Sequence, residues 1–226
     1  MDKKQALIQP SKIMDRFCET FNQAYPNFQI SHPSNECVIM EPSVSNSNSD
    51  FLSLKVVGNN LRDFRYEFAG GTTSFYEKAK SPDPLRSNCD GIFLAQKDGR
   101  NIIFFCELKS SFSEQEICHA KEQLVGTLLR TQAQLAILQK NCNFEIHGVI
   151  VSYAPTSENL SYVAKQTGPR GFFLQNLCSR NHHDMNAAKC AAFYDPWNVP
   201  SFRIHYVQVP IHKQHYTISI DELLTI

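Results

Sequence analysis

Hydrophobic residues recur along the chain at two spacings, and each spacing predicts a different element. From Ser11 to Tyr25 they recur every three or four residues, which predicts an amphipathic helix that Pro26 ends. The same spacing predicts a longer helix over residues 113–139, where Ser113 and Glu116 have the spacing of a capping box. This helix carries a second, polar stripe that we interpret as a solvated face; its members are His119, Gln123, Thr127, Arg130 and Gln134.

Short hydrophobic runs between polar or proline-rich segments predict strands at residues 51–57, 63–68, 144–153, 202–209 and 215–220. Residues 154–200 contain several prolines and glycines, and we expect them to be irregular, as an insertion or lid. The order strand, strand, helix, strand is typical of mixed α/β architecture. We therefore expect one domain over residues 1–226, with a core at about 11–153 and a C-terminal extension at 154–226 that is part irregular and part β.

The most informative pattern is a pair of hydrophobic runs joined by a turn sequence. Residues 89–94 and 102–109 flank Asp98-Gly99, a strong signal for a β-hairpin. Side chains alternate faces along a strand, so Glu107 and Lys109 share one face. Pairing of the two strands brings Asp90, which opens the first, close to Glu107 near the end of the second. Two carboxylates beside an ammonium group predict a site for a divalent metal ion.

The charge balance changes this picture only in part. Lysine plus arginine and aspartate plus glutamate both number 22, which gives a formal net charge of zero and a sequence pI of about 7.1. Nucleic-acid-binding domains usually carry a basic excess. The balance therefore argues mildly against tight autonomous binding of nucleic acid, but not against its cleavage. Either the positive charge is clustered locally, or a protein partner or a second copy of the chain helps to deliver the substrate.

The eight cysteines are scattered without a CxxC pair, as expected of reduced thiols inside a cell. The first residues lack the apolar stretch of a signal peptide, and no run is long enough to cross a bilayer. These features predict a soluble, cytoplasmic protein that does not associate with membranes.

The pattern Asp90 … Glu107-Leu108-Lys109 resembles the PD-(D/E)xK nuclease superfamily, of restriction-endonuclease-like fold. The resemblance covers roughly residues 11–153 and implies a core of a helix, a three-stranded antiparallel meander, a helix and a strand. It also implies that Asp90 and Glu107 hold Mg²⁺ or Mn²⁺ together with the Leu108 carbonyl. Lys109 would then orient the attacking water and stabilise the developing negative charge.

Two further residues are assigned by the same resemblance. Gln123 stands where several nuclease branches carry a glutamine on the helix after the E-x-K motif. Many members also place an acid on the first helix, and Glu19 is our candidate, with Glu67 and Glu77 as alternatives. The chain departs from the family in having Cys89 at the position of the motif proline. A literal Pro82-Asp83 precedes the strand, so Asp83 is a rival to Asp90, which we prefer because it opens the strand directly.

The resemblance implies a metal-dependent nuclease that hydrolyses phosphodiester bonds, of DNA rather than RNA, with a role in microbial defence or restriction. The alternative is a non-catalytic member of the same fold that serves as a nucleic-acid- or protein-binding subunit. A separate cluster of Cys178, His182, His183 and Cys190 has the side chains for a Cys₂His₂ zinc site. Its spacing fits no familiar zinc finger, so we favour an ordinary histidine-bearing loop there over a zinc-stabilised interaction module.

Overall fold

The Asp98-Gly99 hairpin lies at the centre of the sheet. The computed structural model describes residues 10–40, 53–65, 67–70, 84–138, 142–187 and 198–226. Strands β3 (Gly91–Lys97) and β4 (Arg100–Lys109) pair antiparallel from Gly91↔Cys106 to Lys97↔Arg100. Asp98 and Gly99 both have positive φ, which is the backbone of a two-residue type I′ turn. The predicted hairpin is confirmed, with Asp90 one residue before β3.

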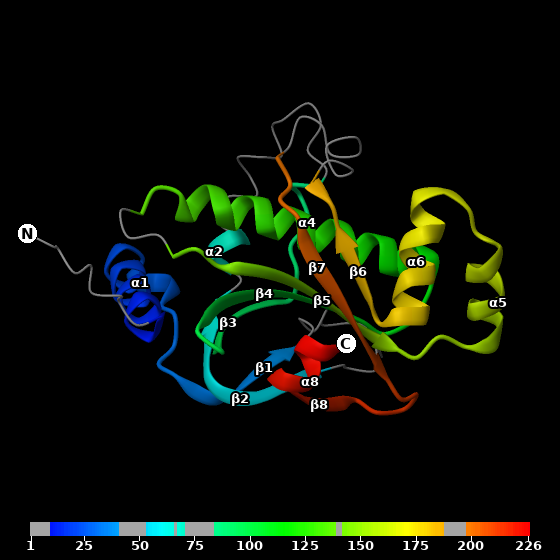
Figure 1. Cartoon of the computed structure of the whole chain (residues 1–226), viewed down its shortest axis with the longest axis horizontal. Coiled ribbons are helices and arrows are strands. Elements are labelled where there is room, and N and C mark those ends of the chain that lie inside the picture. The colour runs from blue at the N-terminus through cyan, green and yellow to red at the C-terminus, as the bar shows by residue number, and fades with distance from the viewer. Residues whose placement is uncertain (1–9, 41–52, 66, 71–83, 139–141, 188–197) are drawn as a thin grey trace, which may run out of the picture.

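The remaining described strands extend this hairpin into a mixed, eight-stranded sheet of order β1-β2-β3-β4-β5-β7-β6, with β8 paired to β2 (Figure 1). Strands β2, β3 and β4 form an antiparallel meander, and β5 and β7 continue parallel to β4. The other bounds are β1 Ser34–Met40, β2 Ser53–Phe64, β5 Glu145–Tyr153, β6 His182–Met185, β7 Phe202–Val209 and β8 His215–Ser219. The predicted α/β class is therefore confirmed.

Six α-helices and one short 3₁₀ helix accompany the sheet in the described residues. Helix α4 lies along one face of the central strands, and α5 and α6 flank one end of the sheet (Figure 1). Their bounds are α1 Pro10–Ala24, η1 Pro26–Phe28, α2 Glu67–Gly70, α4 Glu114–Leu135, α5 Ser157–Lys165, α6 Gly168–Arg180 and α8 Ile220–Thr225. None of the helices described is long and apolar enough to span a membrane.

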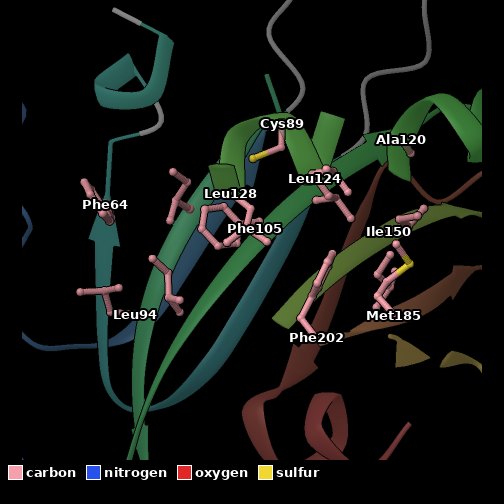
Figure 2. Close-up of a cluster of buried hydrophobic side chains, with 14 of the residues drawn as sticks. Phe64, Cys89, Leu94, Phe105, Ala120, Leu124, Leu128, Ile150, Met185 and Phe202 are labelled. Carbon is pink, nitrogen blue, oxygen red and sulfur yellow. The ribbon is translucent and has the colours of Figure 1, made fainter. Parts of the chain in front are cut away.

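Both faces of the central strands are buried, each in its own hydrophobic core. On one face, Phe105 and Ile150 pack with Leu124 and Leu128 of α4, as Figure 2 shows. On the other, Phe104 and its neighbours face the curled part of the sheet formed by β1, β2 and β8, together with α8. Each such buried side chain stabilises the fold by roughly 1.5–3 kcal/mol. Strand β4 is thus held between two apolar layers, and the charged Glu107 near its end is buried as well.

Two sequence predictions about strands were wrong. Residues 53–57 and 63–64, from the two predicted runs at 51–57 and 63–68, belong to a single strand, β2. Its first half pairs with β1 and β8, and its last residues pair with β3. Asn60, with a φ of 58°, lies between these two parts. Glu67–Gly70 is helical rather than extended. Strand β1 was not predicted, because Val38 and Met40 are exposed on it and blur the alternation.

The expectation that residues 154–200 are irregular was also wrong for most of that segment. Helix α5 begins with a capping box between Thr156 and Asn159, and α6 buries Phe173, Leu174 and Leu177. Strand β6 then pairs antiparallel with β7 and completes one edge of the sheet. The helices are short, so their periodicity was too brief to outweigh the prolines and glycines around them. Residues 188–197 lie outside the described part.

Candidate active site

Glu107 is a buried carboxylate at the end of β4. The residue is 1% exposed, and Oε1 lies 2.7 Å from Lys109 Nζ. The other oxygen, Oε2, is buried and has no hydrogen-bond partner in the described residues. Burial, and secondly the neighbouring Asp90, raise the pKa of this carboxyl to about 8, although Lys109 and Gln123 oppose the shift. A buried acid with an unsatisfied oxygen is costly for the fold, which makes it a candidate ligand for a cation.

Lys109 joins this acid to helix α4. Its Nζ donates to Gln123 Oε1 at 2.8 Å as well as to Glu107, and the Glu116 carboxylate lies 3.9 Å away, beyond hydrogen-bond distance. The ammonium has three N–H donors, so within the described residues one remains for a water or a phosphate oxygen. Gln123 also donates from Nε2 to the Asn88 carbonyl at 2.9 Å. It therefore bridges the end of β4 and the segment that leads into β3.

Asp90 lies beside Glu107 because the hairpin register places it opposite the end of β4. Its amide donates to the Cys106 carbonyl at 2.9 Å, and its Oδ2 accepts from the Leu108 amide at 2.7 Å. Residues two apart in a strand direct their carbonyls to the same side. The Leu108 carbonyl therefore points, like that of Cys106, to the side on which Asp90 lies. The two carboxylates and this backbone carbonyl therefore lie at the same end of the hairpin.

The polar stripe of α4 does not form a solvated face, so that interpretation was wrong. Four of its members, Gln123, Thr127, Arg130 and Gln134, turn inward; we call these four the inner polar stripe. Thr127 Oγ1 accepts from the Cys89 amide at 2.8 Å. Arg130 has no exposed surface, and its guanidinium donates to the carbonyls of Leu85 and Ser87 and to Asn88 Oδ1. Gln134 donates to the Phe68 carbonyl at 2.8 Å. Only His119 is exposed.

A glycine in α4 marks this contact in the sequence. A Cβ at Gly126 would collide with the Pro84 carbonyl and lie 2.9 Å from the Ser87 carbonyl. The helix therefore touches the backbone of residues 84–90 directly. A polar stripe has the same spacing whether water or buried backbone faces it. A glycine inside a strong helical pattern was thus the available signal that something packs closely there.

The other predicted acids are not joined to this cluster. Glu19 is exposed on α1 and Glu67 is exposed at the start of α2. Within the described residues, neither forms a hydrogen bond or ion pair with Asp90, Glu107 or Lys109. Glu77 and Asp83, the rival to Asp90, lie outside the described residues.

The predicted zinc cluster is described only in part, because Cys190 falls outside. Cys178 is half-buried on α6, His183 Nδ1 is bonded to the Asn176 amide at 3.0 Å, and His182 Nδ1 to the Arg180 carbonyl at 3.0 Å. In the part of the chain that the structure describes, no three histidine, cysteine, aspartate or glutamate side chains gather closely enough to hold a metal ion. The Asp90–Glu107 cluster has only two such side chains, so a third protein ligand would have to come from the backbone.

The raised pKa of Glu107 predicts how the stability of the metal-free protein depends on pH. The folded protein keeps this proton up to about pH 8, whereas the unfolded chain releases it near pH 4.5, the ordinary pKa of a glutamate side chain. Between these values the folded state binds more protons, so its free energy of unfolding falls as pH rises, by up to about 1.4 kcal/mol per pH unit.

Urea unfolding in EDTA, from about pH 5 to about pH 8, measures this slope. The Glu107→Gln variant removes the titrating group and should lack that part of the slope. Parallel pH profiles for the wild type and the variant would show that Glu107 is ionised in the folded protein at neutral pH.

No family model, no curated protein and no solved structure matches the chain.

Proposed function

We propose that the protein is a metal-dependent nuclease that hydrolyses phosphodiester bonds, with DNA as the favoured substrate. The observation that carries the proposal is the buried Glu107 carboxylate, one oxygen of which lacks a partner in the described residues, beside Asp90 and Lys109. A protein interior does not retain two neighbouring carboxylates unless a cation or a proton compensates them. A surface salt bridge, the simplest alternative for Glu107 and Lys109, is inconsistent with 1% exposure of Glu107.

The ligand atoms fit Mg²⁺ or Mn²⁺. Asp90, Glu107 and the Leu108 carbonyl offer only oxygen, which these hard cations prefer, and Mg²⁺ would keep several waters in its remaining positions. No thiol or imidazole belongs to the set, which disfavours zinc. When bound, the cation would supply positive charge that polarises the scissile phosphate and acidifies a water.

The side chains of the chain itself would perform the other steps. The ammonium of Lys109, fixed by Glu107 and Gln123, would direct its remaining N–H toward the attacking water and stabilise charge that develops on the phosphate. Gln123 would keep Lys109 in place and hold the Asn88 carbonyl, and so the start of β3. A rigid arrangement of this kind lowers the barrier because little reorganisation remains at the moment of reaction.

The order of elements supports the same proposal. Helix α1, the antiparallel strands β2, β3 and β4, helix α4 and the parallel strand β5 follow the core order implied by the resemblance to PD-(D/E)xK nucleases, with β1 inserted before β2 and the short α2 before β3. The preference for DNA over RNA rests on that resemblance. A basic protein partner would compensate for the absence of a net positive charge on the chain, whereas a homodimer would help only by bringing positive side chains together locally.

The test is cleavage of plasmid, linear duplex DNA, single-stranded DNA and RNA with Mg²⁺, Mn²⁺ or EDTA. Wild-type protein should cleave at least one DNA substrate only with metal, and Glu107→Gln should lower the rate by about 100-fold or more. Glu36→Gln, which removes an exposed carboxylate paired with Lys55, is the matched control and should cleave like the wild type. Binding of nucleic acid without cleavage in any metal would favour a non-catalytic member of the fold instead.

A further inference from the structure

We infer that Thr127 is a positioning residue for Asp90, and that through Asp90 it sets the affinity of the site for its divalent cation. This inference rests on the proposed function, since it concerns the same cluster. The carboxylate must lie within a few tenths of an ångström of its place for the oxygen ligands to converge. Asp90 precedes β3, so the ladder of the hairpin alone does not fix the segment before it.

The peptide unit between Asn88 and Cys89, one residue before Asp90, is held at both ends by α4. Gln123 Nε2 donates to the Asn88 carbonyl at 2.9 Å, and Thr127 Oγ1 accepts from the Cys89 amide at 2.8 Å. These two groups belong to the same planar peptide, so the two contacts fix its orientation. On the far side, the Asp90 amide is fixed by the Cys106 carbonyl at 2.9 Å. Asp90 therefore follows a backbone that is held in place on both sides.

The same two residues of α4 link both parts of the site. Thr127 Oγ1 donates to the Gln123 carbonyl at 2.9 Å, which orients its lone pairs toward Cys89. Gln123 Oε1 in turn accepts from Lys109. Helix α4 thus sets the position of Asp90 relative to Lys109 and Glu107, although it supplies no metal ligand itself.

Because both residues are buried, no water can replace the Thr127 hydroxyl as the acceptor for the Cys89 amide. Thr127 has no exposed surface and Cys89 is 1% exposed. Without the hydroxyl, the Cys89 amide would remain buried and unpaired. Because an unpaired buried amide is unfavourable, residues 88–90 would shift toward another acceptor. A shift of Cys89 would carry Asp90 with it. Loss of a residue that orients a metal ligand typically weakens metal binding about 10–100-fold.

The helix also offers a matched control one turn further on. Thr131 is 1% exposed, and its hydroxyl makes no hydrogen bond within the described residues. Thr131→Val therefore removes a hydroxyl of equal burial from the same helix without touching the Asn88–Asp90 segment. Thr127→Ser keeps the hydroxyl and removes only a methyl group.

Binding of Mn²⁺ measured by electron paramagnetic resonance, with no nucleic acid present, tests the inference. Thr127→Val should raise the dissociation constant for Mn²⁺ about tenfold or more, whereas Thr127→Ser and Thr131→Val should stay within about threefold of the wild type. Amide hydrogen exchange of the metal-free proteins is the second readout. Thr127→Val should speed exchange at Leu108, whose amide is bonded to Asp90, and Thr131→Val should not.

Equal Mn²⁺ affinity and equal Leu108 exchange in Thr127→Val and Thr131→Val would overturn the inference. If Thr127→Val does not fold, Thr127→Ala and Thr131→Ala replace the pair, because alanine introduces no bulk. A wild type that binds no Mn²⁺ and cleaves nothing would refute the proposed function and, with it, the effect on metal affinity. Leu108 exchange would then still decide whether Thr127 holds Asp90. Wild-type binding with no difference between the variants would refute the inference alone.

Discussion

Replacing Lys109 with methionine is expected to slow cleavage by about 1,000-fold at saturating Mg²⁺. Methionine keeps an apolar stem of similar length but removes the ammonium that is bonded to Glu107 and Gln123. That ammonium also opposes the rise in the pKa of Glu107, so its loss will favour the protonated acid and weaken metal binding near neutral pH. The rate must therefore be compared where this second effect is absent.

Single-turnover cleavage at saturating metal, from about pH 6 to about pH 9, separates the two effects. If Lys109 acts in the chemical step, the loss will persist at the highest pH. Recovery to the wild-type rate there would mean that Lys109 serves only to ionise Glu107. Lys97→Met makes the same substitution at the opposite end of the hairpin, where the lysine pairs with Asp221, and should not change the rate.

Replacing Arg130 with methionine is expected to lower the free energy of unfolding by about 3–5 kcal/mol. The guanidinium is fully buried and donates to the carbonyls of Leu85 and Ser87 and to Asn88 Oδ1. Methionine fills much of the volume but leaves these buried acceptors without their donor. In a chain of this size, such a change corresponds to a fall in the melting temperature of about 10 °C.

Thermal and urea unfolding measure this effect, and Arg86→Met is the matched control. Arg86 lies in the same segment but is exposed, so its substitution should change stability by less than about 0.5 kcal/mol. Equal stability of the two variants would show that the contacts of Arg130 contribute no net stability. Arg130→Lys should not restore the wild-type value, because a lysine cannot reproduce the planar fork that reaches several acceptors.

The central part of the fold was predictable because local signals and long-range pairing agree there. Asp98-Gly99 specified the hairpin, and Ser113 caps α4 as expected, accepting from the Glu116 amide at 3.2 Å. The split of β2 into two strands was wrong because residues 58–60, with two asparagines, resemble a turn although the strand continues through them. Here pairing with β1 and β8 outweighs the local preference of the residues.

The candidate site was predictable only as far as the hairpin extends. Alternation along β4 and the register of β3 place Asp90, Glu107 and Lys109 together, whereas their catalytic roles remain predictions. The second half of the site, Thr127 and Arg130 on the inner polar stripe, was not predicted. Thr127 accepts from the Cys89 amide and Arg130 donates to the carbonyls of Leu85 and Ser87, and such backbone partners leave no trace in the pattern of side chains.

The pairing of β8 with β2 has a consequence for the synthesis of the chain. Residues 53–57 of β2 pair in parallel with residues 215–219, roughly 160 residues later. At about 5–20 residues per second, a ribosome needs on the order of 10–30 s to make the intervening chain. During that time one edge of β2 has no partner strand and offers a template to other nascent chains. Translation that slows within this stretch should therefore reduce the yield of native protein more than the same delay placed earlier.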